Sequence, residues 1–162
     1  MQKSSHDSSK KPTPTARRKA RRLALQALYQ WQLTQLSPLE IQNQFLQEQI
    51  STKVDVPYFI ELLTSATRCV AELDDYIRPT LDRRVEELNP IELTILRIGV
   101  FELAHRPDIP YRVVIDEALR LAKTFGATEG FRFVNAVLHK IAHDLRQVET
   151  QSPQKTHSSR DE

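Results

Sequence analysis

The residues best suited to binding chemistry are cations that open an amphipathic stretch at residues 15–34: Arg17, Arg18, Lys19, Arg21 and Arg22. Arginine makes charge-assisted planar contacts with phosphates and stacks on unpaired bases, so the cluster favours a nucleic-acid contact. The cations also oppose local helix stability, because the helix macrodipole disfavours positive charge at an N-terminus. Arginine runs serve equally as localisation signals, membrane-surface segments or protein-binding arms. Charge alone therefore favours RNA or DNA only modestly.

A second candidate is the segment TFGATEGFRFVNAVLHKI at residues 124–141. Its predicted helix start offers backbone N–H groups beside Arg132, with aromatic rings at Phe131 and Phe133. These rings project about 200° apart on a helix, so we expect one in the core and the other free to stack on a base. Two ordinary aromatic side chains at the core edge fit the periodicity about as well.

Candidates for catalysis or metal binding are poor. His139 and His143 have the spacing of a metal-binding pair, but they lack an HExxH context and a nearby cysteine, so we expect surface side chains. The acidic pairs are adjacent rather than facing, and the glycines form neither a phosphate loop nor a dinucleotide fingerprint. The sequence therefore predicts a protein that is not an enzyme and binds no metal or cofactor.

Length and composition predict an all-α protein. The 162 residues suit one domain or two small packed subdomains, and glycine is scarce while Leu, Ala, Glu, Arg and Gln dominate. Residues 1–22 carry a formal charge of about +7 and the remainder about −5, which suits a polyanionic partner. Cys69 is the only cysteine, and no apolar stretch is long enough for a membrane span or a secretory signal. We expect a soluble, cytoplasmic protein with no membrane partner.

Two helices are predicted in the N-terminal part of the chain. The first covers residues 16–33 with Thr15 as N-cap, and the second follows Ser37 with a proline and an N3 acid and ends near residue 50. The first helix has an inner stripe at Ala20, Ala24, Ala27, Leu28 and Trp31. Its opposite side, which we expect to be exposed and available to a partner, carries Arg18, Arg22, Leu25 and Tyr29.

The rest of the chain is also predicted to be helical. One long helix runs from Pro57 to about residue 78, and a central helix that is apolar on most sides covers residues 90–106 with Asn89 as cap. A further helix closes at Gly126 as a C′ glycine, and Thr128 caps the last helix. Residues 1–14 and 147–162 are polar and expected to be disordered, which leaves residues 15–146 as the folded domain.

Four stretches carry a family resemblance: ARRKARRLALQALYQWQL, VPYFIELL, LDRRVEELNPIELTILRIGVFEL and IPYRVVIDEALRLAKTFGATEGFRFVNAVL. Together they resemble the NusB family of bacterial transcription antitermination factors, over roughly residues 16–145. The resemblance implies six to seven helices in two small packed subdomains. It also implies binding of single-stranded boxA RNA together with NusE, a ribosomal small-subunit protein. The complex would join the RNA polymerase elongation complex with NusA and NusG and suppress premature termination, notably in ribosomal RNA transcription.

Matching motif positions imply the site residues. RNA contacts at the basic start would be made by Arg17, Arg18, Lys19 and Arg21. RNA contacts at a second site would be made by Glu129, Arg132, Phe133 and Asn135. The NusE-facing surface would include Tyr29 and Glu92, although Glu92 also fits a purely structural role as a capping acid. Gly130 and Phe131 stand where family members often have polar residues.

Three alternatives stay open at this stage. NusB-like domains occur as the RNA-binding part of ribosomal RNA cytosine methyltransferases, but such an enzyme needs an α/β cofactor domain, and no residues remain to build one. A second alternative is a helical protein-binding adaptor whose arginines only keep it soluble. A homodimer of the free protein, in which the partners cover the basic surface, is likewise left open.

Overall fold

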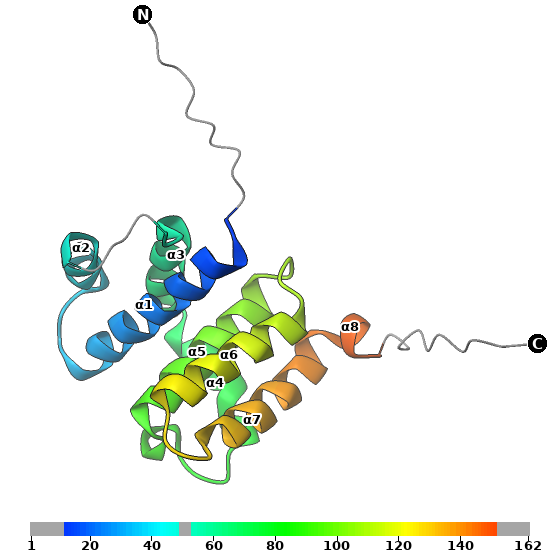
Figure 1. Cartoon of the computed structure of the whole chain (residues 1–162). Helices are drawn as coiled ribbons and strands as arrows, with labels where there is room; N and C mark the ends of the chain where they lie inside the picture. Colours follow the sequence, from blue (N-terminus) through cyan, green and yellow to red (C-terminus); the bar gives the residue numbers. More distant parts are fainter. Residues whose placement is uncertain (1–11, 49–52, 152–162) are drawn as a thin grey trace, which may run out of the picture. The chain divides into compact units, whose positions relative to one another are not determined.

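The computed structural model describes residues 12–48 and 53–151 (Figure 1). Within these residues the chain forms eight α-helices and two short 3-10 helices, and no strand. It divides into two compact units, Met1–Val70 and Ala71–Glu162. The predicted all-α class with two subdomains is confirmed. None of the described helices is both long and apolar enough to cross a bilayer.

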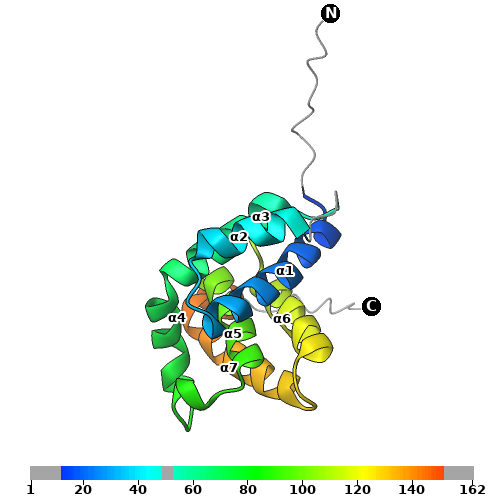
Figure 2. The ribbon, with the colours of Figure 1, turned by 90° about the vertical axis from the view of Figure 1, so that its left-hand side faces the viewer.

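The N-terminal unit contains α1 (Pro14–Leu33), α2 (Pro38–Glu48) and α3 (Val56–Arg68), which pack against one another (Figures 1 and 2). The alanines and Leu28 of the predicted inner stripe of α1 are buried, and Trp31 is half-buried. The prediction that Leu25 is exposed is wrong, since only 2% of it is accessible. The burial of α1 extends well beyond one narrow stripe, because Leu23, Ala24 and Leu25 are buried in succession.

Capping residues set where the first two helices begin. Thr13 Oγ1 accepts a hydrogen bond from the Ala16 N–H at 3.0 Å, with Pro14 in the first turn. The prediction of Thr15 as N-cap is therefore wrong, because the helix starts earlier. The capping box of α2 is confirmed: Ser37 N–H donates to Glu40 Oε2 at 3.0 Å, and Glu40 N–H donates to Ser37 Oγ at 3.2 Å. The predicted end of this helix near residue 50 lies outside the described residues.

The long helix predicted after Pro57 is two helices, α3 and α4 (Val70–Ile77), which meet at Cys69. Cys69 has φ −99° and ψ 13°, and its N–H bonds to the Ser65 carbonyl as the C-cap of α3. Thr67 Oγ1 donates to the Leu63 carbonyl at 2.8 Å, and such bonding to the backbone often bends helices. This break and an additional helix near the C-terminus raise the number of α-helices in the described residues to eight, one above the predicted six to seven. The 3-10 helix η1 (Arg78–Thr80) then ends α4 at the predicted proline.

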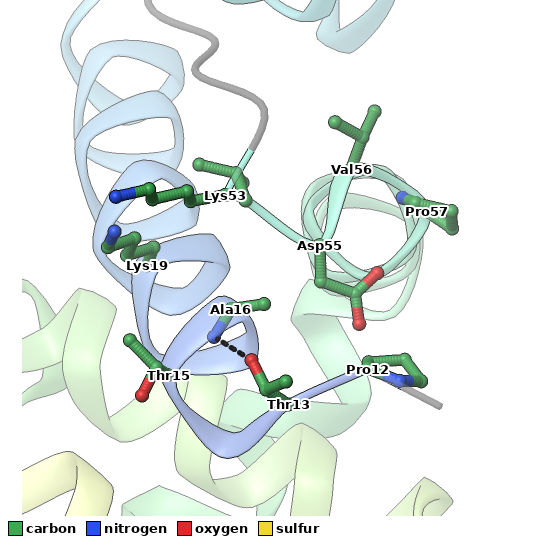
Figure 3. Close-up of a pocket in the computed structure, with 10 residues that line it drawn as sticks. Pro12, Thr13, Thr15, Ala16, Lys19, Lys53, Asp55, Val56 and Pro57 are labelled. Atoms are coloured by element: carbon green, nitrogen blue, oxygen red, sulfur yellow. Dashed lines mark hydrogen bonds between the residues drawn. The ribbon is translucent and has the colours of Figure 1, made fainter. Parts of the chain in front are cut away.

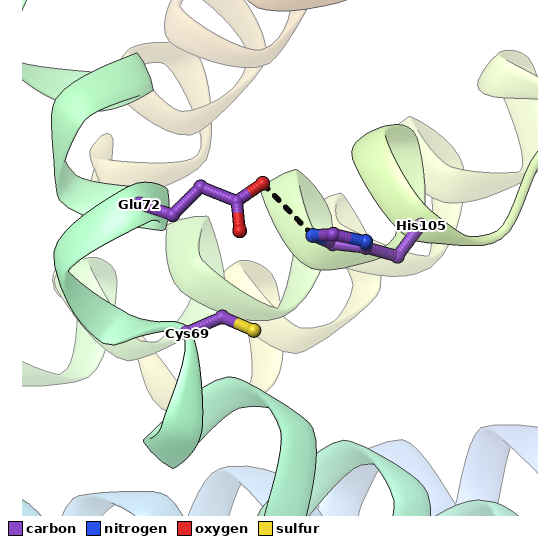
Figure 4. Close-up of side chains that lie close together, drawn as sticks. All are labelled: Cys69, Glu72 and His105. Carbon is purple, nitrogen blue, oxygen red and sulfur yellow. Dashed lines mark hydrogen bonds and ion pairs between the residues drawn. The ribbon is translucent and has the colours of Figure 1, made fainter.

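The C-terminal unit is built around α5 (Pro90–His105), which packs against α6 (Tyr111–Phe125) and α7 (Gly130–Leu145). Asn89 Oδ1 caps α5 by accepting from the Ile91 N–H at 2.9 Å, as predicted. Two side-chain pairs link α5 to α4. Arg97 makes a bidentate bond to Asp74 at 2.9 Å, and His105 Nε2 lies 2.9 Å from Glu72 Oε1 (Figure 4). The 3-10 helix η2 (Val85–Glu87) precedes the cap.

The turn between α6 and α7 differs from the prediction. Gly126 has extended backbone, φ −81° and ψ 172°, rather than the left-handed conformation typical of a C′ glycine. Thr128 does not cap α7, because the N-cap position belongs to Glu129. Glu129 is the one non-glycine residue of positive φ, 72°, in the described chain.

The last described helix, α8 (Gln147–Gln151), lies in the stretch that was expected to be a polar tail. The buried Arg146 precedes it and donates to the carbonyls of Glu102, Leu103, Arg106 and Ile109 at 2.9 to 3.1 Å. Arg146 also pairs with Glu149 of α8. The remaining tail, residues 152–162, and residues 1–11 lie outside the described residues.

Candidate nucleic-acid interface

The basic start of α1 contains cations in different surroundings. Arg17, Arg18 and Lys19 are half-buried and Arg22 is exposed. Arg21 is only 3% accessible. On a helix, residues 17 and 21 share one face, and residues 18 and 22 share the next. The structure therefore places the outer cations, defined here as Arg18, Lys19 and Arg22, on a different part of the helix from Arg17 and Arg21.

Arg17 and Arg21 lie against α3. Their guanidinium carbons are 5.0 and 5.4 Å from the ring centroid of Tyr58, within the range of cation–π contact. Arg17 Nε is also 3.8 Å from Asp55 Oδ2. Asp55 is the N-cap of α3, since its Oδ1 accepts from the Tyr58 N–H at 3.1 Å. Both arginines thus contact residues that the sequence had not linked to the basic start.

A pocket of about 590 Å³ lies beside these cations, where the first turns of α1 and α3 approach each other (Figure 3). Thr13, the N-cap of α1, lines it together with Thr15 and Lys19 of α1, and Lys53, Asp55 and Pro57 line it from the segment that begins α3. Figure 3 shows the amine ends of Lys19 and Lys53 pointing the same way. An anionic ligand that approached the pocket from the side of these amines would therefore meet the charges of Lys19 and Lys53 together.

The second set of predicted residues lies at the start of α7, in the C-terminal unit. Arg132 Nε is 2.8 Å from Glu129 Oε2, and both side chains are mostly exposed. Phe131 has two cations over its ring, Lys123 at 5.2 Å and Arg132 at 5.8 Å from the centroid. Asn135 follows one turn later and is half-buried. The structure brings these side chains to one end of one helix.

Phe133 lies under a cation that the sequence had not singled out. Arg83, in the segment before η2, has its guanidinium carbon 5.8 Å from the ring centroid of Phe133. The prediction that one of the two phenylalanines belongs to the core is wrong, because Phe131 and Phe133 are both half-buried. Each ring therefore keeps an accessible part that a base could cover.

The predicted partner residues lie in separate units. Tyr29 is half-buried on α1, and Glu92 is half-buried in the first turn of α5. Glu92 reaches α7: a Cβ added to the buried Gly130 would come within 1.9 Å of Glu92 Oε1. Gly130 is thus the residue that leaves room for this carboxylate beside Glu129 and Arg132.

Sequence reasoning missed Asp55, Tyr58, Arg83 and Lys53 as neighbours of the two sites. A signal existed for Asp55, because an Asp two residues before a proline fits an N-cap. The four-residue spacing of Arg17 and Arg21 gives them a common face, but it does not indicate that Tyr58 lies against that face. No local pattern indicates Arg83. His139 and His143 are exposed, and neither belongs to a described group of three metal-binding side chains.

The family model, two similar proteins and a solved structure all point to the same family. The sequence matches the NusB family over residues 18–143. A "Transcription antitermination protein NusB" from Alcanivorax borkumensis is 55% identical over 137 residues, which cover 85% of this chain and 91% of the relative. A protein of the same name from Idiomarina loihiensis is 52% identical, covering 82% and 96%. The solved structure of T. maritima NusB has a TM-score of 0.72 and 25% identity, covering 87% of this chain and 99% of that one.

Proposed function

The chain belongs to the NusB family, and from this premise we propose that it is a non-catalytic transcription antitermination factor that binds single-stranded boxA RNA. The observation that carries the proposal is the cluster of cations at the start of α1, in a chain whose relatives are named as antitermination proteins. Arg22 of this cluster is exposed, and Arg18 and Lys19 are half-buried. Cations attract the phosphates of any RNA and supply affinity and a fast on-rate, but they do not read sequence.

Base recognition is assigned to the start of α7. Phe133 would stack on an unpaired base, while Arg132, Asn135 and Glu129 would contact base edges or the neighbouring phosphate. At the basic start, Arg18 and Lys19 are the proposed phosphate contacts. Arg17 and Arg21 belong to the same site, and their packing against Tyr58 favours a supporting role.

The protein partner is proposed to be NusE, which would bind through Tyr29 and Glu92. With NusE bound, the complex would join RNA polymerase, NusA and NusG and suppress premature termination during ribosomal RNA transcription. Tyr29→Ala should weaken association with NusE and leave the helical circular-dichroism spectrum unchanged, because Tyr29 is only half-buried. Gln26→Ala, an exposed substitution on the same helix, is the matched control.

The proposal is tested by titrating the full chain with a boxA-like RNA and with a scrambled RNA of the same composition. The titration is repeated with and without NusE over a salt series from about 50 to 200 mM. We expect tighter binding of the boxA-like RNA and a larger difference when NusE is present. Equal affinity for both RNAs under every condition would rule out specific recognition.

Matched charge variants separate the basic start from general electrostatics. Arg18→Ala combined with Lys19→Ala should weaken binding and flatten the salt dependence. Arg120→Ala combined with Lys140→Ala removes the same charge from two exposed positions on other helices and should have a much smaller effect. Equal losses from both pairs would favour the alternative in which the cations only keep a protein-binding adaptor soluble.

A further inference from the structure

We propose that Tyr58 and Asp55 are positioning residues, which hold Arg17 and Arg21 against α3 and so orient the outer cations of α1 toward RNA. The inference rests on the proposed RNA-binding function and goes beyond it. It separates the cations that contact RNA, which are the outer cations, from Arg17 and Arg21, which support the start of α1. It also adds two residues of the second half of the N-terminal unit to the RNA site.

The ring of Tyr58 makes cation–π contacts with both Arg17 and Arg21. Tyr58 and Arg21 are each 3% accessible, and the guanidinium carbons of Arg21 and Arg17 lie 5.4 and 5.0 Å from the ring centroid. A cation–π contact is strongest where water is excluded. A phosphate could reach Arg21 only if this contact opened, so Arg21 suits a supporting role better than a contacting one.

Asp55 is a second neighbour of Arg17 at the start of α3. Its side chain is 7% accessible, and its backbone N–H donates to the Ala16 carbonyl at 3.2 Å, which joins the start of α3 to the start of α1. Arg17 Nε is buried without a hydrogen-bond partner, and the carboxylate oxygen of Asp55 at 3.8 Å is its nearby opposite charge. The ring and the carboxylate together therefore determine where Arg17 lies.

The start of α1 needs such support. Its first turn contains no acid, and several cations stand where the macrodipole is unfavourable to them. If this turn frays in the free protein, RNA binding has to order it, and the ordering cost lowers the affinity. Loosening the contact should therefore reduce affinity without changing how many phosphates the bound protein contacts.

The test compares two ring-to-aliphatic substitutions on neighbouring positions of α3. Tyr58→Leu removes the ring beneath the arginines, while Phe59→Leu is the matched control, because Phe59 is also buried and its ring contacts that of Phe45 in a tilted pair instead. Affinity for a boxA-like RNA is measured across a salt series for both variants. The full chain is used, at a temperature where circular dichroism shows each variant folded.

We expect Tyr58→Leu to weaken RNA binding about five- to tenfold. This is less than the roughly thirtyfold that corresponds to full loss of a buried cation–π contact, because the contact affects RNA only through the position of the outer cations. The slope of log affinity against log salt should stay at the wild-type value. Tyr58→Phe keeps the ring face and should bind within about twofold of the wild type. An unchanged affinity for Tyr58→Leu, or an equal loss for Phe59→Leu, would overturn the proposal. So would a shallower slope, by about 0.7 for each phosphate lost, because it would make Arg17 and Arg21 direct contacts.

Asp55→Asn gives a second test that does not depend on the ring. Asparagine is a good N-cap, so α3 should stay intact. A carboxylate that merely lies near the RNA repels it, and its removal would tighten binding. A positioning carboxylate has the opposite effect, and we expect Asp55→Asn to bind severalfold more weakly. Tighter or unchanged binding would remove Asp55 from the proposal.

Amide hydrogen exchange in the free protein separates this inference from the proposed function. Tyr58→Leu should speed exchange at residues 17–23 of α1, whereas Phe59→Leu should not do so selectively. If the wild type bound no RNA but this difference appeared, the function would fail and the structural contact would stand. If RNA binding were specific and exchange were unaffected by Tyr58→Leu, the positioning role alone would fail.

Discussion

Glu129 has an unusual backbone conformation at the point where the proposed base-reading side chains begin. Its φ of 72° is left-handed, a conformation that costs a non-glycine residue on the order of 1 kcal/mol. The ion pair with Arg132 offsets little of that cost, because both side chains are more than 60% exposed. Strain of this kind often persists where function requires the geometry.

Replacing Glu129 by asparagine should raise the free energy of unfolding by about 0.5–1 kcal/mol, because asparagine tolerates left-handed backbone better than glutamate. Urea unfolding of the full chain measures the change. Glu129→Gln is the matched control, since it removes the charge and keeps the backbone cost. Equal stabilisation by both variants would attribute the effect to charge instead.

The sequence could not predict which residue of this turn would be left-handed. Two glycines flank the turn, yet Gly126 is extended and Gly130 has negative φ inside α7. Gly130 is small for another reason, because a Cβ there would meet the carboxylate of Glu92. That contact joins positions far apart in the chain, and neither turn propensity nor helical periodicity reports on it.

The start of α1 shows how an element boundary depends on one hydroxyl. Thr13 and Thr15 flank the same proline, and only Thr13 accepts a hydrogen bond from a first-turn N–H. A proline is favoured at the first helical position, which places the cap immediately before Pro14. Applied to Pro14, this preference predicts Thr13 as the cap, whereas the predicted start at residue 16 placed the cap two residues too late.

Thr13→Ala should therefore destabilise the protein by about 1 kcal/mol, the usual cost of losing a threonine N-cap. Thr15→Ala is the matched control and should change stability by less than about 0.5 kcal/mol, because Thr15 is exposed within the first turn. Thermal unfolding followed by circular dichroism measures both. A loss with Thr15→Ala as large as that with Thr13→Ala would contradict the observed cap.

Apolar periodicity predicted the alanine stripe of α1 and the buried α5, because both depend on local spacing that packing preserves. The same periodicity concealed the break at Cys69, since the apolar positions continue in phase across it while Thr67 bonds to the backbone. Local periodicity did not predict α8 either. This helix follows Arg146, which pairs with Glu149 of α8 and donates to four carbonyls of residues distant in sequence.

Glu149 makes the attachment of α8 dependent on pH. Burial opposes ionisation of this carboxyl group, but hydrogen bonds from the Tyr111 N–H and from Arg146, with the charge of Arg146, outweigh it. The pKa of Glu149 therefore lies below its ordinary value of 4.5. A lowered folded-state pKa contributes stability above the ordinary pKa and loses it as pH falls through the folded value.

Glu149→Gln should lower the free energy of unfolding by about 1 kcal/mol at pH 7, since a partly exposed charged hydrogen bond is lost. The difference from the wild type should shrink as pH falls below 4.5. Urea unfolding of both proteins at pH 7, 5 and 3.5 tests this. The difference between their free energies of unfolding at each pH cancels the contribution of the carboxylates that both proteins have. A difference that stayed constant down to pH 3.5 would mean that ionised Glu149 contributes nothing.

At the scale of the whole molecule, the proposed RNA contacts are divided between the two units. The basic start of α1 belongs to Met1–Val70, while Arg132 and the aromatic, amide and acidic side chains at the start of α7 belong to Ala71–Glu162. Positive charge at one end of the chain was evident from composition. The residues that surround Phe133 required the fold, because Arg83 approaches it from a distant segment.

This division predicts two kinds of binding defect. Arg18→Ala with Lys19→Ala should weaken boxA-like and scrambled RNA alike and reduce the salt slope by about 1.4, because two phosphate contacts are lost. Phe133→Leu keeps an apolar side chain but removes the stacking surface, so it should lose about tenfold in affinity for boxA-like RNA with the slope unchanged. Phe131→Leu, an equally half-buried ring two residues earlier, is its matched control.

A triple variant with Arg18→Ala, Lys19→Ala and Phe133→Leu then tests whether the two sets of contacts act independently. If electrostatic attachment and base stacking are separate contributions, the losses in binding free energy should add within about 0.5 kcal/mol. The triple variant should also show both effects together, the reduced slope of the two charge substitutions and the loss of about tenfold in affinity for boxA-like RNA that Phe133→Leu causes. A combined loss much smaller than the sum would mean that Phe133 stacks only when the basic start has already bound the phosphates, and the two contacts would then form one cooperative site.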